Sequence, residues 1–311
     1  MKRVLGFFLI AGLAALPAMA QVRPSNEAGV AGGHQHLASR DAAAYNAFWN
    51  ALGAEPAALG ATPILKFPGM YFMLSGGGGR GGGGGRGAGA PGGAPGAAPA
   101  GAPAAGAPAP AAGGAPRGAG APAAPLLGSE GSTVDYIGFK VKDLKATLAK
   151  LDAVGAKPLA GATATQAFVM SPDMVKVQFV EDKTLATAVA HEEILMKVPS
   201  VADASAWYAK WFGAKIVKQG QVTVAQIPGI NIRFAETKDA VAGTQGRAID
   251  HIGFEVKGLE ALAKKMTDEG VKVGRAYAAA PAQLAPLKSI MFITDPWGTY
   301  IELNEGFADV K

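Results

Sequence analysis

Two stretches of this chain repeat each other closely, and this repeat constrains the fold more than any other feature. VDYIGFKVKDL begins at Val134 and IDHIGFEVKGL begins at Ile249. Each stretch alternates apolar and polar residues, as a strand with one buried face does, and leads into an amphipathic helical segment. The glycines that close these segments, Gly155 and Gly270, keep the offset of the strands and suit helix C-caps. The sequence therefore predicts a duplicated strand–helix unit.

A second pair of repeats alternates with the first. HQHLASRDAAAYNAFWNALGAEP from His34 and EILMKVPSVADASAWYAKWFGAK from Glu193 both read as a strand, a helix start and an aromatic helix that ends in Gly-Ala. Each is followed by a Pro-Gly turn, in KFPGMYFMLSG and QIPGINIRFAE. We therefore predict four modules, each a strand, a helix and two or three further strands. Modules 1 to 4 cover residues 32–75, 131–182, 190–237 and 247–306.

The segments outside the modules have a different composition. Residues 1–20 combine a basic start, an apolar run and Ala-Met-Ala before Gln21, which predicts a secretory signal peptide and a periplasmic or extracellular protein. The apolar run is shorter than the roughly 20 residues that a membrane span needs, and no later stretch could span a bilayer. Residues 76–125 are almost entirely Gly, Ala and Pro. Because such a tract cannot offset its backbone entropy, we predict a disordered linker over residues 76–130.

Composition excludes several kinds of site. The chain has no cysteine, so disulfides, thiolate metal sites and cysteine nucleophiles are absent. The net charge is only +5. The glycine-rich tract carries scattered arginines without aromatic residues, which makes a poor surface for stacking bases or binding phosphates. We therefore expect a small-molecule substrate or ligand and no nucleic-acid partner.

The four modules resemble the vicinal oxygen chelate superfamily, which includes glyoxalase I, bleomycin and fosfomycin resistance proteins, and extradiol dioxygenases. The resemblance is carried by the repeated βαβββ pattern, with DHIGFEV opening module 4 and DPWGTYIEL closing it. It implies an α+β fold in which modules pair edge to edge into curved sheets, or cups, with helices behind. We expect modules 1 and 2 (32–182) to form an N-terminal cup and modules 3 and 4 (188–306) a C-terminal cup. Pairing between chains, as a homodimer, stays open.

Strand alternation predicts which side chains face each cup. In IDHIGFEVK the apolar positions belong under the helix, which puts His251 on the open face. The same alternation puts Tyr300 and Glu302 on the cup face of the last strand, and Glu193 on that of the first strand of module 3.

The superfamily resemblance implies a metal site at these positions. Its ligands lie at the start of the opening strand and at the glutamate of the closing strand. In the expected C-terminal cup these positions hold His251, Glu302 and Glu193, for one divalent ion, Fe, Mn or Zn. Glu193 stands where the superfamily usually has histidine, and a register shift would bring His191 there instead. Arg233 and Tyr300 are candidate substrate contacts, although Arg233 could equally form an ion pair with a carboxylate.

The expected N-terminal cup is poorer in metal donors. Its four corresponding positions hold His34, Met73, Tyr136 and Gln178. A divalent ion needs at least three N or O donors, so we predict a degenerate cup without metal, with His36 as the one further histidine that faces it.

Two functions follow from the resemblance. The first is an exported metal-dependent enzyme of the dioxygenase, lyase or isomerase type, which chelates a substrate through vicinal oxygens in the C-terminal cup. Glyoxalase I itself is disfavoured because it acts on a cytosolic glutathione adduct. The alternative is a non-catalytic small-molecule-binding protein of the bleomycin-resistance type.

Overall fold

The structure, a computed structural model, describes residues 22–76 and 126–310. The expected signal peptide and nearly all of the expected linker lie outside the described residues. Residues 126–130, the last part of the predicted linker, are part of the fold. Ser129 is fully buried, and its hydroxyl donates to the carbonyl oxygen of Asp135 at 2.7 Å. The linker boundary predicted at residue 130 is therefore too late.

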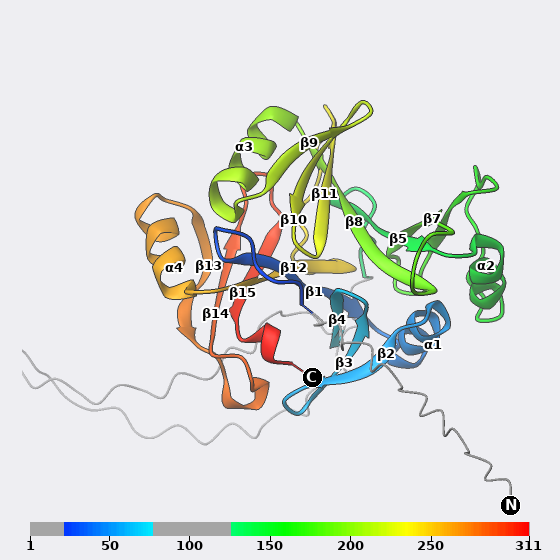
Figure 1. Ribbon diagram of the computed structural model, residues 1–311, viewed down its shortest axis with the longest axis horizontal. Helices are drawn as coiled ribbons and strands as arrows, with labels where there is room; N and C mark the ends of the chain where they lie inside the picture. The colour runs from blue at the N-terminus through cyan, green and yellow to red at the C-terminus, as the bar shows by residue number, and fades with distance from the viewer. Residues whose placement is uncertain (1–21, 77–125, 311) are drawn as a thin grey trace, which may run out of the picture.

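The predicted modules are present (Figure 1). Module 1 consists of β1 (Val30–Ser39), α1 (Ala42–Leu52), β2 (Glu55–Leu59), β3 (Thr62–Phe67) and β4 (Met70–Gly76). Module 2 consists of β5 (Val134–Val141), α2 (Leu144–Asp152), β6 (Gln166–Met170) and β7 (Lys176–Glu181). Module 3 consists of β8 (Val189–Val198), α3 (Val201–Phe212), β9 (Lys215–Gln219), β10 (Val222–Ile227) and β11 (Ile230–Glu236). Module 4 consists of β12 (Ile249–Val256), α4 (Leu259–Asp268), β13 (Lys272–Ala279), β14 (Ser289–Thr294) and β15 (Tyr300–Glu305).

Local sequence signals set the helix ends. The side chains of Asp41, Asp143 and Ser200 accept hydrogen bonds from the first turns of α1, α2 and α3, as N-caps do. The predicted closing glycines Gly155 and Gly270 have φ angles of 83° and 76°, a conformation that glycine adopts without a steric penalty. Module 2 departs from the βαβββ plan, because an isolated bridge between Pro158 and Val169 takes the place of its third strand.

The strands form two sheets, and their composition corrects the expected domain pairing. One sheet has the order β13-β14-β15-β12-β1-β4-β3-β2 and joins modules 1 and 4; we call it the 1/4 sheet. The other has the order β6-β7-β5-β8-β11-β10-β9 and joins modules 2 and 3; we call it the 2/3 sheet. The expected pairing of module 1 with 2 and of module 3 with 4 is wrong. The edge of β5 is taken by antiparallel β8, which follows module 2 directly, so β1 pairs with β12.

The main hydrophobic core lies between the sheets and the helices and draws on all four modules. Aromatic contacts cross module boundaries within it. The ring centroids of Phe72 in module 1 and Phe139 in module 2 are 5.9 Å apart. The ring of Phe212 in module 3 stacks on that of Phe254 in module 4, with centroids 4.6 Å apart. The two sheets are therefore held together by one continuous apolar interior. None of the helices in the described ranges is long and apolar enough to cross a membrane.

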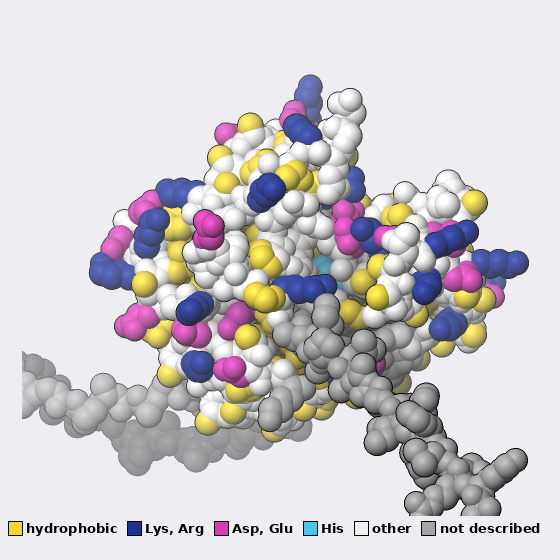
Figure 2. All heavy atoms as spheres, in the orientation of Figure 1, with side chains coloured by type: hydrophobic (Ala, Val, Ile, Leu, Met, Phe, Trp, Pro, Cys, Tyr) yellow, Lys and Arg dark blue, Asp and Glu magenta, His cyan; other side chains and the backbone are white. Residues whose placement is uncertain are grey.

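A smaller apolar cluster lies apart from this core. It contains Tyr71 and Met73 of β4 together with Leu287, Phe307 and Val310 near the end of the chain. The outer surface is mixed in charge: Figure 2 shows lysine and arginine side chains interspersed with aspartate and glutamate on the face in view.

Candidate metal centre

Four titratable side chains converge in the cup of the 1/4 sheet. His34 and His36 come from β1, His251 from β12 and Glu302 from β15, and one donor atom from each lies within 4.8 Å of all the others. The Oε2 atom of Glu302 is 2.7 Å from His251 Nε2 and 3.2 Å from His34 Nε2. His36 Nδ1 is 2.9 Å from His251 Nε2. Three of the four side chains are buried, and only His36 is partly exposed.

The glycine of the I-G-F motif makes room for this group. Gly253 is the strand partner of His34 across the β1–β12 pair. A Cβ atom at Gly253 would lie 2.0 Å from Cε1 of the His34 ring, closer than non-bonded atoms can approach. Glycine is therefore required at this position for the histidine to reach Glu302.

Neighbouring side chains orient the group. His251 Nδ1 donates to Oδ1 of Asp250 at 2.6 Å, which turns Nε2 toward Glu302. Asn304 Nδ2 donates to the other oxygen of Glu302 at 2.7 Å. A carboxylate behind a histidine and an amide behind a glutamate are the usual outer partners of metal ligands.

The electrostatics of the group favour a cation at its centre. Burial alone would lower the pKa of His251, but its hydrogen bonds to Asp250 and Glu302 raise that pKa to about 9. Burial would likewise raise the pKa of Glu302, but His34 and His251 hold it well below its usual range. Burial lowers the pKa of His34, and burial and the neighbouring His251 lower the pKa of His36 to about 3. Two neutral imidazoles thus surround a carboxylate and one proton that a metal ion could displace.

The donor set also fits a divalent ion geometrically. Metal–ligand distances of about 2.1 Å place adjacent donors roughly 3–3.4 Å apart. The 3.2 Å separation from His34 Nε2 to Glu302 Oε2 lies in this range, and the 2.7 Å separation from His251 Nε2 is shorter because those two atoms share a hydrogen bond. His34, His251 and Glu302 form a set of two histidines and one carboxylate, which suits Fe(II), Mn(II) or Zn(II).

Glu193, the third ligand expected beside His251 and Glu302, lies in the other cup. Its Oε1 accepts from Tyr136 Oη at 3.1 Å and from Arg233 Nε at 2.9 Å. His34, expected in a degenerate cup, takes the place beside His251 instead. The structure thus corrects the expected grouping, because it pairs the modules differently.

The cup of the 2/3 sheet repeats the same positions with other residues. Gly138 is the strand partner of Glu193, and a Cβ atom there would lie 2.8 Å from Glu193 Cγ and 3.4 Å from Gln178 Oε1. His191 points away from this cup: it is buried against the rings of Phe139 and Phe72, and burial lowers its pKa to about 3. The alternative in which His191 replaces Glu193 therefore does not hold.

The remaining candidates divide between the two cups. Tyr300 lies beside the donor group as expected, with its ring centroid 5.8 Å from that of His251. Its ring stacks on Phe292, with centroids 5.1 Å apart. Met73 is the strand partner of His36 and belongs to the smaller apolar cluster. Arg233 lies on β11 of the 2/3 sheet, whereas His251 lies on β12 of the 1/4 sheet. The Nε atom of Arg233 forms an ion pair with Glu193, one of the two roles expected for it.

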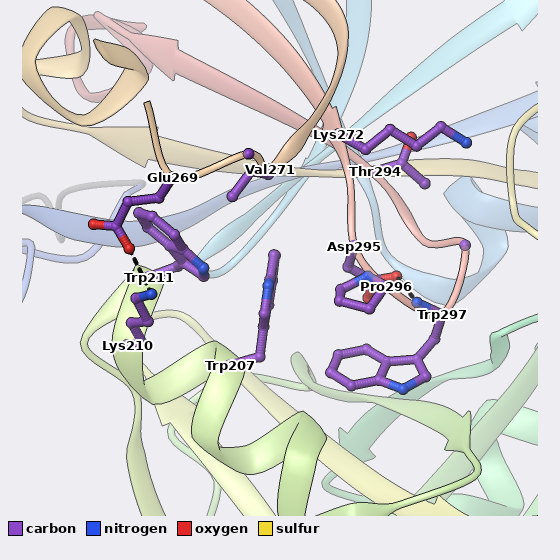
Figure 3. Close-up of a pocket in the computed structure, with 12 residues that line it drawn as sticks. Trp207, Lys210, Trp211, Glu269, Val271, Lys272, Thr294, Asp295, Pro296 and Trp297 are labelled. Carbon is purple, nitrogen blue, oxygen red and sulfur yellow. Dashed lines mark hydrogen bonds and ion pairs between the residues drawn. The ribbon is translucent and has the colours of Figure 1, made fainter. Parts of the chain in front are cut away.

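A separate hollow of about 560 Å³ lies between α3 and module 4 (Figure 3). Trp207 and Trp211 of α3 and Trp297 of the β14–β15 turn line it, and Lys210 bridges it to Glu269 at 2.6 Å. None of the four donor side chains lines this hollow. Trp297 is partly buried and packs against the main hydrophobic core.

Comparisons with known proteins agree with this architecture. Residues 191–303 match the model of the Glyoxalase/Bleomycin resistance protein/Dioxygenase superfamily. A mutant of glyoxalase I from Zea mays superposes with a TM-score of 0.58 at 12% identity, over 90% of this chain and 95% of that one. A candidate dioxygenase from Bacillus subtilis superposes with a TM-score of 0.54 at 12% identity, over 93% of this chain and 88% of that one. No curated protein sequence matches the chain.

At these identities the solved structures establish the fold, and the family model adds a sequence match over the region it covers. Both agree with the module pattern. Residues 191–303 thus match the glyoxalase/bleomycin resistance/dioxygenase superfamily model, and the whole chain has the two-domain fold of the glyoxalase I structures.

Proposed function

We propose that the chain is a divalent-metal-dependent enzyme that acts on a small molecule with two neighbouring oxygen atoms. Its site is the cup shared by modules 1 and 4, rather than a cup of modules 3 and 4. The observation that carries the proposal is the convergence of His34, His251 and Glu302, from three strands, on one buried point. Buried ionisable groups drawn together in this way are costly unless they serve a site.

The donor residues have distinct parts in this proposal. A bound ion would supply Lewis-acid chemistry, which holds vicinal oxygens and stabilises negative charge on them. Glu302 supplies the anionic donor, and Asp250 fixes the ring of His251 through its Nδ1.

His36 is placed to contact a substrate. It is the one member of the group with partial exposure, and burial and His251 lower its pKa to about 3, so that it is neutral at physiological pH. A neutral imidazole at the edge of the group can accept a hydrogen bond from a substrate hydroxyl, whereas a pKa of about 3 makes it a weak proton acceptor. Tyr300 and Phe292, which flank His251, line the approach on the same side.

The leader at residues 1–20 adds a location to the proposal: we infer that the protein acts outside the cytosol. This supports a substrate other than the glutathione adduct of glyoxalase I.

A second candidate is a non-catalytic small-molecule binder. It is favoured by one observation: in the structure His251 is fully hydrogen-bonded between Asp250 and Glu302, so the cup is chemically consistent with a proton in place of a metal.

Metal analysis separates the two candidates. Protein lacking residues 1–20 is loaded with Fe(II), Mn(II) or Zn(II), and its metal content is measured after desalting. We expect one ion per chain, its loss in His251→Ala, and its retention in Tyr136→Ala, the matched change in the other cup. Absence of bound metal under every loading condition would exclude the enzyme and leave the binder.

A further inference from the structure

The smaller apolar cluster fills one half of the cup of the 1/4 sheet, which we call the metal cup because it holds the proposed metal ligands. Phe307, in the short 3-10 turn that follows β15, is fully buried, and its ring stacks on the ring of His34 with centroids 4.8 Å apart and an interplanar angle of 18°. Tyr71, Met73 and Leu287 complete the packing around it. This half of the cup, next to His34, is therefore occupied by the chain itself.

The C-terminal turn is held in place by specific hydrogen bonds. The backbone N–H groups of Gly306 and Phe307 donate to the two carboxylate oxygens of Glu255, on β12, at 3.1 and 2.8 Å. Tyr71 Oη donates to the carbonyl oxygen of Val310 at 3.1 Å. Gly306 has a φ angle of 111°, and a Cβ atom there would lie 2.6 Å from the carbonyl oxygen of Pro286. The turn therefore requires glycine at this position.

The other half of the cup is more accessible. His36, Phe292 and Tyr300 are all partly exposed, whereas His34 has no exposed surface. A ligand can therefore approach the donor group beside His36 and Tyr300, but not across the face of His34 that Phe307 covers.

We infer that Phe307 is a specificity-determining residue: it closes the His34 side of the cup and confines ligands to the half between His36 and Tyr300. The inference rests on the proposed function, because that function places the ligand in this cup. Phe307 limits the size of the group that a ligand can carry beyond its chelating oxygens. Removing its ring opens apolar space directly against His34.

Hydroxamates provide a test, because they chelate metals through two neighbouring oxygens while their other end can be varied. Binding of acetohydroxamate, benzohydroxamate and 2-naphthohydroxamate to the Co(II)-loaded protein is followed by the visible spectrum of the metal. We expect Phe307→Ala to tighten 2-naphthohydroxamate relative to acetohydroxamate by about tenfold or more, a typical effect of enlarging an apolar pocket. Phe179→Ala, which truncates an equally buried ring on β7 in the main core, should leave the ratio unchanged. An unchanged ratio in a folded Phe307→Ala protein overturns the inference.

A metal-independent measurement separates this inference from the proposed function. If wild-type protein binds no Co(II), the proposed function fails, but the closure by Phe307 can still be tested with benzene. Dry apolar cavities left by ring deletion bind benzene. We expect benzene to shift the His34 ring resonances of metal-free Phe307→Ala and not those of wild type, and no shift in either would overturn the closure. If Phe307→Ala does not fold, Phe307→Leu and Val310→Ala replace it in both measurements, with the same expected direction and a smaller change.

Discussion

The cup of the 1/4 sheet and the cup of the 2/3 sheet are built on the same positions and hold different chemistry. Each has a glycine from an I-G-F strand that admits a side chain from the partner strand, His34 in one cup and Glu193 in the other. The equivalent cup positions, with the 1/4 cup first in each pair, are His251 and Tyr136, Glu302 and Gln178, His34 and Glu193, and Met73 and Arg233.

The two cups differ in the group that neutralises their buried carboxylate. In the 2/3 cup the guanidinium of Arg233 neutralises Glu193 within the chain. In the 1/4 cup Met73 stands at the equivalent position and offers no charge, so Glu302 depends on a proton shared with His251 or on a bound cation. The arginine thus neutralises one cup from within the chain, and the methionine leaves the other dependent on a proton or a bound cation.

The largest effect is expected from filling the glycine of the metal cup. In Gly253→Ala the new methyl group would displace the His34 ring, which we expect to weaken metal binding at least about a hundredfold and destabilise the fold by about 1–3 kcal/mol. Metal titration and urea denaturation measure both. In the matched variant Gly138→Ala the nearest atom is the flexible Cγ of Glu193, and metal binding should not change. Wild-type metal affinity in Gly253→Ala would show that His34 is not a ligand.

The next effect concerns stability in the 2/3 cup alone. Glu193→Ala removes the acceptor of both Tyr136 and Arg233, which should cost about 1–3 kcal/mol of unfolding free energy. Metal content should stay at the wild-type level, because Glu193 lies in the other sheet. Loss of metal in Glu193→Ala would instead restore Glu193 as a ligand.

The pH dependence of metal binding should reflect the proton on His251. Because the pKa of His251 is raised to about 9 in the metal-free protein, a metal must displace that proton at neutral pH. Affinity should therefore rise by about tenfold per pH unit up to about pH 9 and level off above it. Chelator competition across this range measures the slope, and Asp250→Asn, which lowers the pKa of His251, should make the affinity level off at a lower pH. A pH-independent affinity would contradict this account.

The same shift has the opposite sign for the stability of the metal-free protein. The folded pKa of His251 lies above the unfolded value of 6.5, so its contribution is complete below that value and is lost as pH rises through about 9. Urea denaturation of the metal-free protein against pH measures this loss, and Tyr136, the matched position, has no equivalent titration in this range.

The smallest effect is a gain. Combining Tyr136→His, Gln178→Glu and Arg233→Met gives the 2/3 cup counterparts of the three proposed ligands, with Glu193 in place of His34 and Leu195 at the position of His36. We expect a second metal ion per chain, bound more weakly than the first because Asp135, the counterpart of Asp250, is engaged by Lys176 and Lys197. Metal content after graded chelator treatment measures it. A folded triple variant that still binds a single ion would show that these positions alone do not make the site.

The sequence predicts the modules and the direction of their side chains well, because both follow from local periodicity. Alternation in β12 and β15 correctly places His251 and Glu302 in one cup, where their donor atoms are 2.7 Å apart. The sequence places the end of the linker too late, because residues 126–130 carry no periodic pattern. Ser129 is nevertheless buried, and it contacts Lys176 of β7, which is distant in the sequence.

The pairing of modules could not be predicted in this way. Strands pair through backbone hydrogen bonds, which are the same for every opening strand, so β12 carries no local mark that selects β1 over β8. Because β12 pairs with β1, His34 lies in the site beside His251. Because β8 pairs with β5, Glu193 lies in the other cup. The one available signal was the pair of inward-facing histidines in module 1, His34 and His36, which had no matching donors in module 2.

The order of modules in the two sheets is nested, with the first and last modules enclosing the middle two. As the chain leaves the ribosome, β5 and β8 can pair early, but β1 must wait for β12, and Glu302 arrives last of the four site residues. Long separations of this kind slow folding and leave strand edges open in the meantime. The metal cup is therefore completed only when nearly the whole chain has been made, so an incomplete chain presents β1 as an unpaired edge and no working site.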